Sequence, residues 1–358
     1  MRRTVPTATL LLLTLLLACG GAEKAPVAWR QTYQPFSDRS PLRRPLPPDV
    51  SVHPKSVKMI SDLYDTCKEA MTGPCKFPRL AGAPEDGRFF TLYGSPIYIG
   101  GANTKQRTVP CTLLPCGVQG LTGEQTVALF DVPIPEGARP DPSDDAHMIV
   151  YEPARGYVWE MFGASVNKTT GRWKTRGGMR WDLAGPGYDE IGEPGTAVGA
   201  GIPMFGTILR PEEVRAAMKD GTGVVPHVLS GGYDSPRIDC FIGPMAKTTD
   251  GDDGRTWAIP EGAILQLDPM LDVDKLELDP AAKVIARTLQ RYGLVIRDDT
   301  GAFSIDVENV SVEDGAQPGR SALWDEVGLH KDSLAEIQGN MFRVVGWNPA
   351  DAHGKNCL

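Results

Sequence analysis

The stretch HMIVYEPARGYVWEMF, residues 147–162, contains two runs rich in β-branched and aromatic residues. The runs His147–Tyr151 and Tyr157–Phe162 are separated by the linker Glu152–Gly156, which holds a proline and a glycine. Short β-prone runs on either side of such a linker are typical of a β-hairpin. This hairpin is the starting point for the fold prediction, because similar runs recur on both sides of it.

Further short strand-like runs flank the hairpin and are separated by Gly, Pro and Asp. They are Phe89–Leu92, Ile97–Ile99, Thr126–Val132, Arg172–Trp181, Leu294–Arg297 and Phe303–Val307. Helical spacing of apolar residues or clear start and stop residues predict only a few helices, over Ser51–Ala70, Pro211–Lys219 and from Pro280 to just before Gly293. The pattern predicts a mainly β protein, an antiparallel sandwich or jelly-roll-like domain with a few peripheral helices.

The N-terminus has the features of an export signal. Two arginines are followed by the apolar run Leu10–Leu17, and Ala18 and Cys19 come next. The apolar run is far shorter than the roughly 20 residues needed to cross a bilayer. The segment LLAC ending at Cys19 resembles the bacterial lipobox, in which the cysteine is acylated. We expect a signal peptide over 1–18, a lipidated Cys19 with a flexible linker over 19–50, and a single β-rich domain over 51–358.

The remaining cysteines suit an oxidising compartment. Six cysteines follow Cys19, an even number that favours disulfides in an exported protein. The predicted pairs are Cys67–Cys75 and Cys111–Cys116, each closing a small loop, with Cys240–Cys357 left by elimination. Zinc is the alternative, but no paired C-x-x-C spacing supports it.

Composition and missing motifs exclude several functions. The formal net charge is −8 and no basic run stands out, which argues against nucleic acid as a partner. No Gly-rich phosphate loop follows a strand, so no nucleotide and no cofactor is expected. G-x-S-x-G and H-E-x-x-H are also absent from the sequence. We expect the chain at the extracytoplasmic face of a bacterial cell envelope, with its lipid as the membrane contact.

Side-chain alternation in the hairpin depends on its register. If Tyr151 lies opposite Tyr157, one face carries Tyr151 and Trp159 together with Asp145 and His147. Aromatic rings beside polar groups can bind sugars, although ordinary sheet packing is the more frequent role of such rings. The other face carries Glu160 among apolar residues, where burial would raise its pKa as a general acid requires.

Five residues are candidate catalytic groups. Asp145 and Glu213 are the proposed carboxylate pair of a hydrolase, and Glu160 is held in reserve. His147 and His227 are candidate bases or a pair of metal ligands, although a histidine in an apolar strand is more often a core residue. A lyase would also need a cation to neutralise a uronate, and Arg237 is the candidate. These assignments therefore place the chemistry around the hairpin and the segments that pack on it.

The acidic turn Asp250–Arg255 resembles part of a calcium loop. Asp250 and Asp252 fit the first two ligand positions, and Glu261 falls at the closing position. Gly254 and Arg255 depart from the pattern, and no flanking helices are predicted. A solvated turn is the preferred interpretation, with adventitious calcium as the alternative, and no metal ligand is assigned.

Several fragments in combination resemble a broad group of secreted bacterial proteins without an assigned activity. The fragments are Ser40-Pro41 with Pro45–Pro47 and Pro54–Ser56, Asp145–Tyr151, Gly201–Pro203 with Gly206, Ile208 and Glu213, Val225–Leu229, and Arg291–Val295 with Asp298. The resemblance implies a shared β scaffold and a polar site. The segment around His227 departs from the group's usual I-x-H-A-L but keeps the histidine.

Three functions are consistent with these features. The leading hypothesis is a membrane-tethered protein that acts on polysaccharide as a hydrolase or lyase. The second is a non-catalytic glycan-binding or envelope-associated module that uses Tyr151 and Trp159, and the third is a structural lipoprotein. Convergence of the acids and histidines on one site would favour the enzyme, whereas an exposed aromatic strip would favour the binding module.

Overall fold

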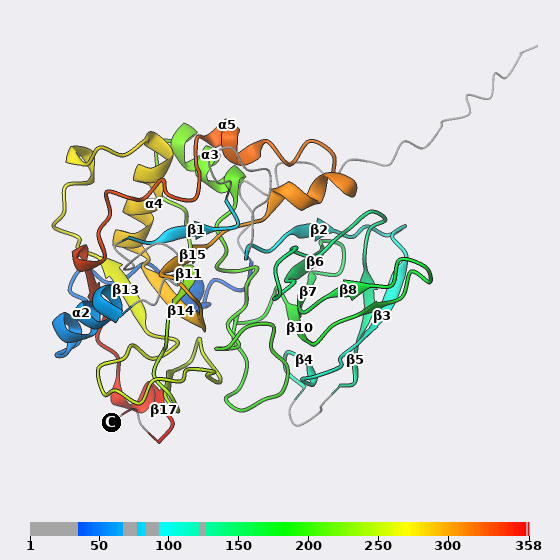
Figure 1. The fold of residues 1–358 in the computed structure, drawn as a ribbon, viewed down its shortest axis with the longest axis horizontal. Helices are drawn as coiled ribbons and strands as arrows, with labels where there is room; N and C mark the ends of the chain where they lie inside the picture. The colour runs from blue at the N-terminus through cyan, green and yellow to red at the C-terminus, as the bar shows by residue number, and fades with distance from the viewer. Residues whose placement is uncertain (1–34, 67–76, 84–92, 122–125, 356, 358) are drawn as a thin grey trace, which may run out of the picture.

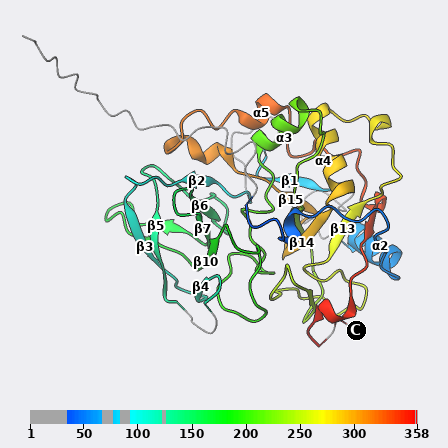
Figure 2. The ribbon, with the colours of Figure 1, turned by 180° about the vertical axis from the view of Figure 1, so that it is seen from behind.

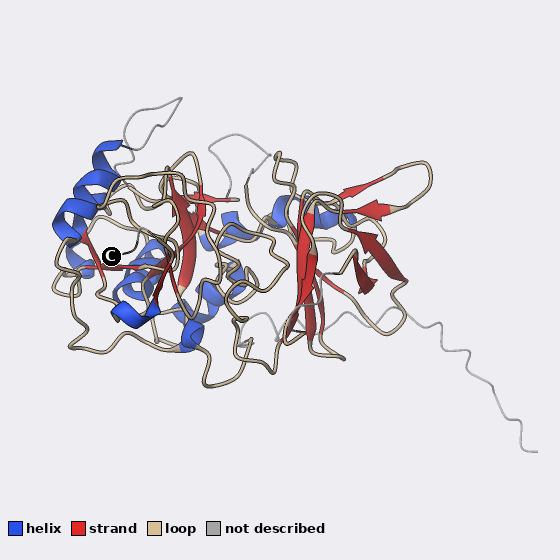
Figure 3. Cartoon of the chain, turned by 90° about the horizontal axis from the view of Figure 1, so that it is seen from below, coloured by secondary structure: helices blue, strands red, loops and turns tan. Residues whose placement is uncertain are grey.

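The computed structural model describes residues 35–66, 77–83, 93–121, 126–355 and 357. Two sheets lie side by side, and the α-helices lie around one of them (Figure 1). Seen from below, their strands form two separate groups (Figure 3). The predicted mainly β protein with few helices is confirmed in this coarse form.

The first sheet has six strands and carries the helices. Its strand order is β1 (Arg79–Ala81), β15 (Ser304–Asp306), β11 (Leu229–Tyr233), β14 (Leu294–Asp299), β13 (Ile264–Leu267) and β16 (Phe342–Val344). The helices around it are α2 (Ser56–Thr66), α3 (Pro211–Lys219), α4 (Pro280–Arg291) and α5 (Leu323–Val327). The predicted ends of α4 are confirmed, since Pro280 occupies its first turn and Gly293 follows it with a positive φ that favours glycine.

The second sheet contains the predicted hairpin. Its strand order is β2 (Ile97–Ile99), β6 (Met148–Glu152), β7 (Tyr157–Phe162), β10 (Gly177–Asp182) and β4 (Cys116–Val118). Two-stranded ribbons complete the described strands: β3 (Gln106–Pro110) with β5 (Ala128–Pro133), β8 (Ser165–Val166) with β9 (Trp173–Lys174), and β12 (Phe241–Ile242) with β17 (Ala352–His353).

Neither main sheet is antiparallel throughout, which departs from the predicted arrangement. Strand pairs β1–β15 and β11–β14 run parallel in the first sheet, as do β2–β6 and β10–β4 in the second. Parallel partners need long connections, and β1 and β15 lie more than two hundred residues apart in the sequence. Local residue patterns carry no information about such distant pairings.

The hairpin exists, but its predicted register is wrong by one residue. Tyr151 pairs with Val158, and Glu152 pairs with Tyr157. Glu152 belongs to β6, so the connection is one residue shorter than expected, and Gly156 closes the turn with a positive φ. A slip of one residue moves a strand's side chains to the opposite face. Glu160 therefore lies on the same face as His147.

A central apolar cluster joins the two sheets. It combines Ile149 and Val158 of the hairpin with Val295 of β14 and with residues 197–208, which pass between the sheets. The N-terminal segment also enters it through Phe36 and Leu42, which are 3% and 0% exposed. Residues 35–50 were expected in a flexible linker, but here they pack along the body. Leu42 O accepts from Val228 N at 2.8 Å, and Leu46 N donates to Arg291 O at 2.8 Å. Figure 2 shows the dark blue segment before α2 running along the first sheet.

Two of the predicted disulfides are present, Cys111–Cys116 and Cys240–Cys357. The second ties the C-terminus to the body, as expected. Cys19 and the predicted pair Cys67–Cys75 lie outside the described residues. Within the described part of the chain, no helix has the length and apolar character needed to span a membrane.

Candidate site at the end of strand β14

Strand β14 changes from apolar to charged residues where it reaches the junction between the sheets. Leu294, Val295 and Ile296 are fully buried, and Arg297 and Asp298 follow. The pairing with β11 skips Arg297, since Gly231 pairs with Ile296 and Gly232 with Asp298. Such a β-bulge redirects side chains, and bulges are frequent next to active sites. Three consecutive charged residues, Arg297, Asp298 and Asp299, therefore form the end of the strand at this bulge.

Arg297 forms a buried polar group with residues of β11, the adjacent strand, and of β15, the strand beyond it. Its Nη2 lies 2.8 Å from Asp306 Oδ2 on β15, and Ser230 Oγ on β11 donates to the same oxygen at 2.9 Å. Arg297 Nε and Nη1 are also buried, and neither has a hydrogen-bond partner within the described part of the chain. Buried donors without partners are rare and costly, so they mark a place where water or a ligand is needed.

The facing hairpin contributes His147 and Glu160 to this inner group. Burial and the nearby Arg297 lower the pKa of His147 to about 3, which keeps the imidazole neutral. Its Nδ1 is buried without a hydrogen-bond partner among the described residues. Burial raises the pKa of Glu160 to about 7, although the hydrogen bonds that its carboxylate accepts act to lower this pKa. Those bonds come from Trp181 Nε1 at 2.9 Å and Phe205 N at 2.7 Å.

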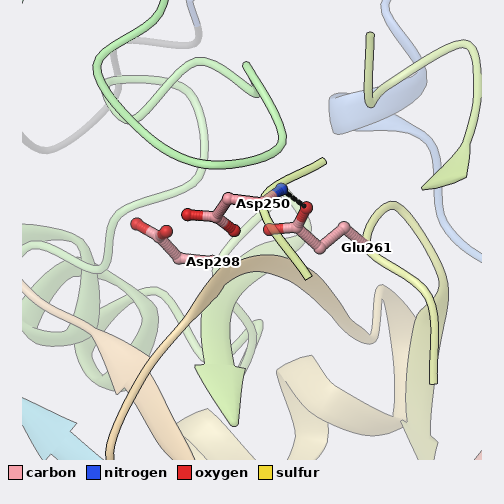
Figure 4. Close-up of side chains that lie close together, drawn as sticks. All are labelled: Asp250, Glu261 and Asp298. Atoms are coloured by element: carbon pink, nitrogen blue, oxygen red, sulfur yellow. Dashed lines mark hydrogen bonds between the residues drawn. The ribbon is translucent and has the colours of Figure 1, made fainter. Parts of the chain in front are cut away.

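Three carboxylates form an outer group at the same strand end. Asp250, Glu261 and Asp298 each contribute an oxygen, and these oxygens all lie within 4.8 Å of one another (Figure 4). Glu261 is fully buried, Asp298 is half-buried and Asp250 is exposed, so the group runs from the interior to the surface. An all-oxygen set of this kind could hold a hard divalent cation.

The surroundings disfavour charge on these carboxylates. Burial, followed by the charges of Asp250 and Asp298, raises the pKa of Glu261 well above its usual range. Burial also raises the pKa of Asp298 strongly, although Arg297 opposes the effect. In the absence of a bound proton or cation, the outer group is therefore a site of negative charge that Arg297 relieves only at Asp298.

The predicted site residues fall in several places. His147 and Glu160 come together, and Asp145 is half-buried just before β6, where burial and Asp141 raise its pKa. Glu213 and His227 form a separate buried pair at the start of α3, with Oε2 and Nε2 3.3 Å apart. The interactions of Glu213 run to His227 and Arg210, so the expected Asp145–Glu213 pair is not what the structure assembles.

The ionisation of Glu213 is set by its neighbours in that separate pair. Burial acts to raise its pKa, but Arg210 and His227 outweigh burial and hold the pKa at about 2. Glu213 is therefore an ionised, buried partner of two basic side chains. This arrangement fixes the start of α3 and leaves no open side for a substrate.

The other predicted binding residues are not arranged for ligand contact. Tyr151 and Trp159 are 3% and 0% exposed, and their rings pack in apolar clusters on opposite faces of the second sheet. They offer no platform to a sugar. Arg237 lies in the loop after β11, where its Nη1 donates to Thr256 O at 3.3 Å. The positive charge that helps to lower the pKa of His147 belongs to Arg297 and not to Arg237.

The sequence interpretation missed Arg297, Asp306 and Ser230, and it treated Asp250 and Glu261 as a solvated turn. A signal was available where the apolar run Leu294–Ile296 is followed directly by Arg297, Asp298 and Asp299. Asp250 and Glu261 do occupy the first and closing positions of the calcium-loop pattern. The third carboxylate comes from β14, which no local pattern could indicate.

Comparison with known proteins gives no relative: no family model matches the chain, and neither do the curated proteins or the solved structures searched.

Proposed function

We propose that the protein is an exported lipoprotein, anchored through Cys19 to the extracytoplasmic face of a membrane, that hydrolyses polysaccharide with the carboxylates Asp250, Glu261 and Asp298. The observation that carries this proposal is the convergence of these three side chains between the interior and the surface. Asp250 is exposed, so a polymer can approach the group from solvent.

Glycoside hydrolysis depends on gathered carboxylates. Most glycosidases use two of them, about 5–10 Å apart, as acid and as nucleophile or base. A second route uses carboxylates to hold a metal ion that polarises the substrate or activates water. The first route would use two of these three carboxylates and the second would use all three, so variants of the same residues test both.

The inner group favours hydrolysis over elimination as the reaction. A lyase would use His147 as base and Arg297 to neutralise a uronate, and these residues do act on one another. Both are almost fully buried, at 6% and 4% exposure, and no residue of the inner group reaches the surface, where a polymer would bind. The outer carboxylates have the exposed edge that the inner group lacks.

A non-catalytic glycan-binding role is the second candidate, and a different feature favours it. A surface depression of about 540 Å³ lies between the N-terminal segment and residues 184–188. Arg39 and Arg44 line it beside Tyr188, and both arginines are exposed. Guanidinium groups bind carboxylate and sulfate groups in two-pronged geometry, so an anionic glycan would fit this surface.

The full chain, purified in detergent, should be incubated with a panel of neutral and acidic polysaccharides. New reducing ends report hydrolysis, and absorbance of unsaturated uronate reports elimination. We expect reducing ends without uronate absorbance for the wild type, and a loss of at least a hundredfold in Glu261→Gln and Asp298→Asn. Asp252→Asn, which changes a neighbouring acid outside the group, is the matched control and should retain activity.

The possible outcomes separate the candidate functions. Product that persists in both carboxylate variants would overturn the assignment of the site. Absence of product, with binding to an acidic glycan that Arg39→Ala and Arg44→Ala together abolish, would favour the binding module. The mass of the N-terminal peptide tests the anchor, because acylation of Cys19 adds fatty-acid chains that Cys19→Ser must lose.

A further inference from the structure

The outer carboxylates come from three separate parts of the chain. Asp250 follows the ribbon strand β12, Glu261 precedes β13, and Asp298 lies in β14. In Figure 4 the Asp250 carboxylate lies between the carboxylates of the other two residues. Like charges at this distance repel one another, so the fold alone gives no reason for bringing them together.

A second observation concerns one oxygen of Glu261. Its Oε2 accepts from Asp250 N at 3.0 Å, whereas Oε1 is buried and has no hydrogen-bond partner among the residues described. In Figure 4 this free oxygen points toward the Asp250 carboxylate. A buried carboxylate oxygen without a donor is costly, and here another acid faces it. The position calls for a positively charged partner.

The nearby protein cations do not fill that role. The charged side chains that shift the pKa of Glu261 are Asp250 and Asp298, and both are acidic. The charge of Arg297 opposes the rise in the pKa of Asp298, but its guanidinium forms its ion pair, through Nη2, with Asp306 in the inner group. Within the described residues, Glu261 therefore has negative neighbours and no basic one.

The backbone of the loop at Gly199 holds two of the carboxylates in place. Gly199 N donates to Asp298 Oδ1 at 3.1 Å. A Cβ on Gly199 would overlap Asp250 Oδ1, so the missing side chain is what lets the Asp250 carboxylate sit against this loop. The positions of these two carboxylates are thus set by contacts with the Gly199 loop, and they are not independent acids on the surface.

From this geometry we infer that Asp250, Glu261 and Asp298 bind a hard divalent cation, with Ca²⁺ as the best match. Calcium takes oxygen ligands at about 2.3–2.6 Å, so two ligands on opposite sides are about 4.6–5.2 Å apart. Oxygens that all lie within 4.8 Å of one another fit around such an ion. Water, or hydroxyl groups of a ligand, would complete the coordination on the exposed Asp250 side.

The inference deepens the proposed function, and only the catalytic role of the ion rests on that function. Binding itself can be measured without any substrate. A protein that binds calcium at this site but cleaves no polysaccharide would refute the hydrolase and leave the cation site standing.

The test uses the full chain in detergent after removal of metals with EDTA. Calcium alone is titrated by calorimetry, and the midpoint of thermal unfolding is followed with and without the ion. We expect one calcium per chain and a higher midpoint in the wild type and in the control Asp252→Asn. Affinity should fall at least tenfold in Glu261→Gln and in Asp298→Asn.

Circular dichroism confirms that each variant folds. Asp250→Asn provides a second test, because Asp250 is exposed and its change leaves the core intact. Unchanged affinity in all three carboxylate variants would overturn the inference. So would the absence of binding for Ca²⁺, Mg²⁺ and Mn²⁺ in the wild type.

Discussion

Glu160 and His147 should give the folded protein two opposite dependences of stability on pH. Burial raises the pKa of Glu160 from 4.5 to about 7, so between these values the folded state keeps a proton that the unfolded state has lost. Its contribution is full below pH 4.5 and is lost as the pH rises through about 7. Burial lowers the pKa of His147 from 6.5 to about 3, so its contribution is full above pH 6.5 and is lost as the pH falls toward 3.

The two effects overlap between pH 4.5 and 6.5, where they oppose each other. Each pH unit corresponds to about 1.4 kcal/mol per proton, and the proton difference is incomplete at the ends of the interval because each unfolded group is half titrated at its own pKa. Each residue therefore changes the free energy of unfolding by about 2 kcal/mol over this interval. In the wild type the two changes cancel. Relative to the wild type, Glu160→Gln should gain about this amount of stability as the pH rises from 4.5 to 6.5, and His147→Asn should lose it.

Urea unfolding at pH 4.5, 5.5 and 6.5 measures these differences directly. All other titrating groups are common to the three proteins, so their contributions cancel when each variant is compared with the wild type. Val158→Ala, a non-titrating change in the same hairpin, is the control and should cost the same at every pH. A Glu160→Gln difference that stays constant within about 0.5 kcal/mol across the range would refute the reasoning.

Three further changes test other parts of the structure. Cys240→Ser removes the bond to Cys357 and should lower the free energy of unfolding by about 2–5 kcal/mol in urea titrations; an unchanged midpoint would show that this bond does not stabilise the fold. Arg320 pairs with three buried glutamates, Glu212, Glu308 and Glu313. Arg320→Met removes this shared basic partner and should lower the free energy of unfolding by about 3–5 kcal/mol, visible as a lower thermal midpoint. An unchanged midpoint would show that these ion pairs do not stabilise the fold. Gly199→Ala should displace the Asp250 carboxylate and weaken calcium binding at least tenfold with little loss of stability, because the displaced atom ends a side chain. Equal calcium affinity in calorimetry would count against the site.

Much of the fold follows from local signals in the sequence. The hairpin of β6 and β7 and the helices α3 and α4 lie where alternation, proline and glycine predict them. The register of the hairpin does not follow, because a connection that includes Glu152 and one that excludes it fit the same sequence. That single residue decides whether Glu160 faces His147, so a small ambiguity changes the composition of the inner group.

The candidate site could be predicted only in part. Asp250 and Glu261 attract attention through their spacing, but their third partner, Asp298, is distant in sequence and arrives through the pairing of β14 with β11 and β13. The inner group depends on Arg297 reaching Asp306 across the glycines of β11. Contacts made through a strand bulge and a neighbouring strand leave no periodic trace in the sequence.

If Cys19 carries the proposed lipid, the length of chain between Cys19 and the folded body limits where the protein can act. Only a short stretch of sequence separates Cys19 from Pro35, and even a fully extended chain advances by no more than about 3.6 Å per residue. Phe36 packs in the apolar cluster between the two sheets. The proposed lipid would therefore be joined to the folded body by a short connection that enters the body at this cluster. The carboxylates could then contact substrate only in a thin layer next to the bilayer. Polymers rooted in that membrane would be within reach, and those farther away would have to come to it.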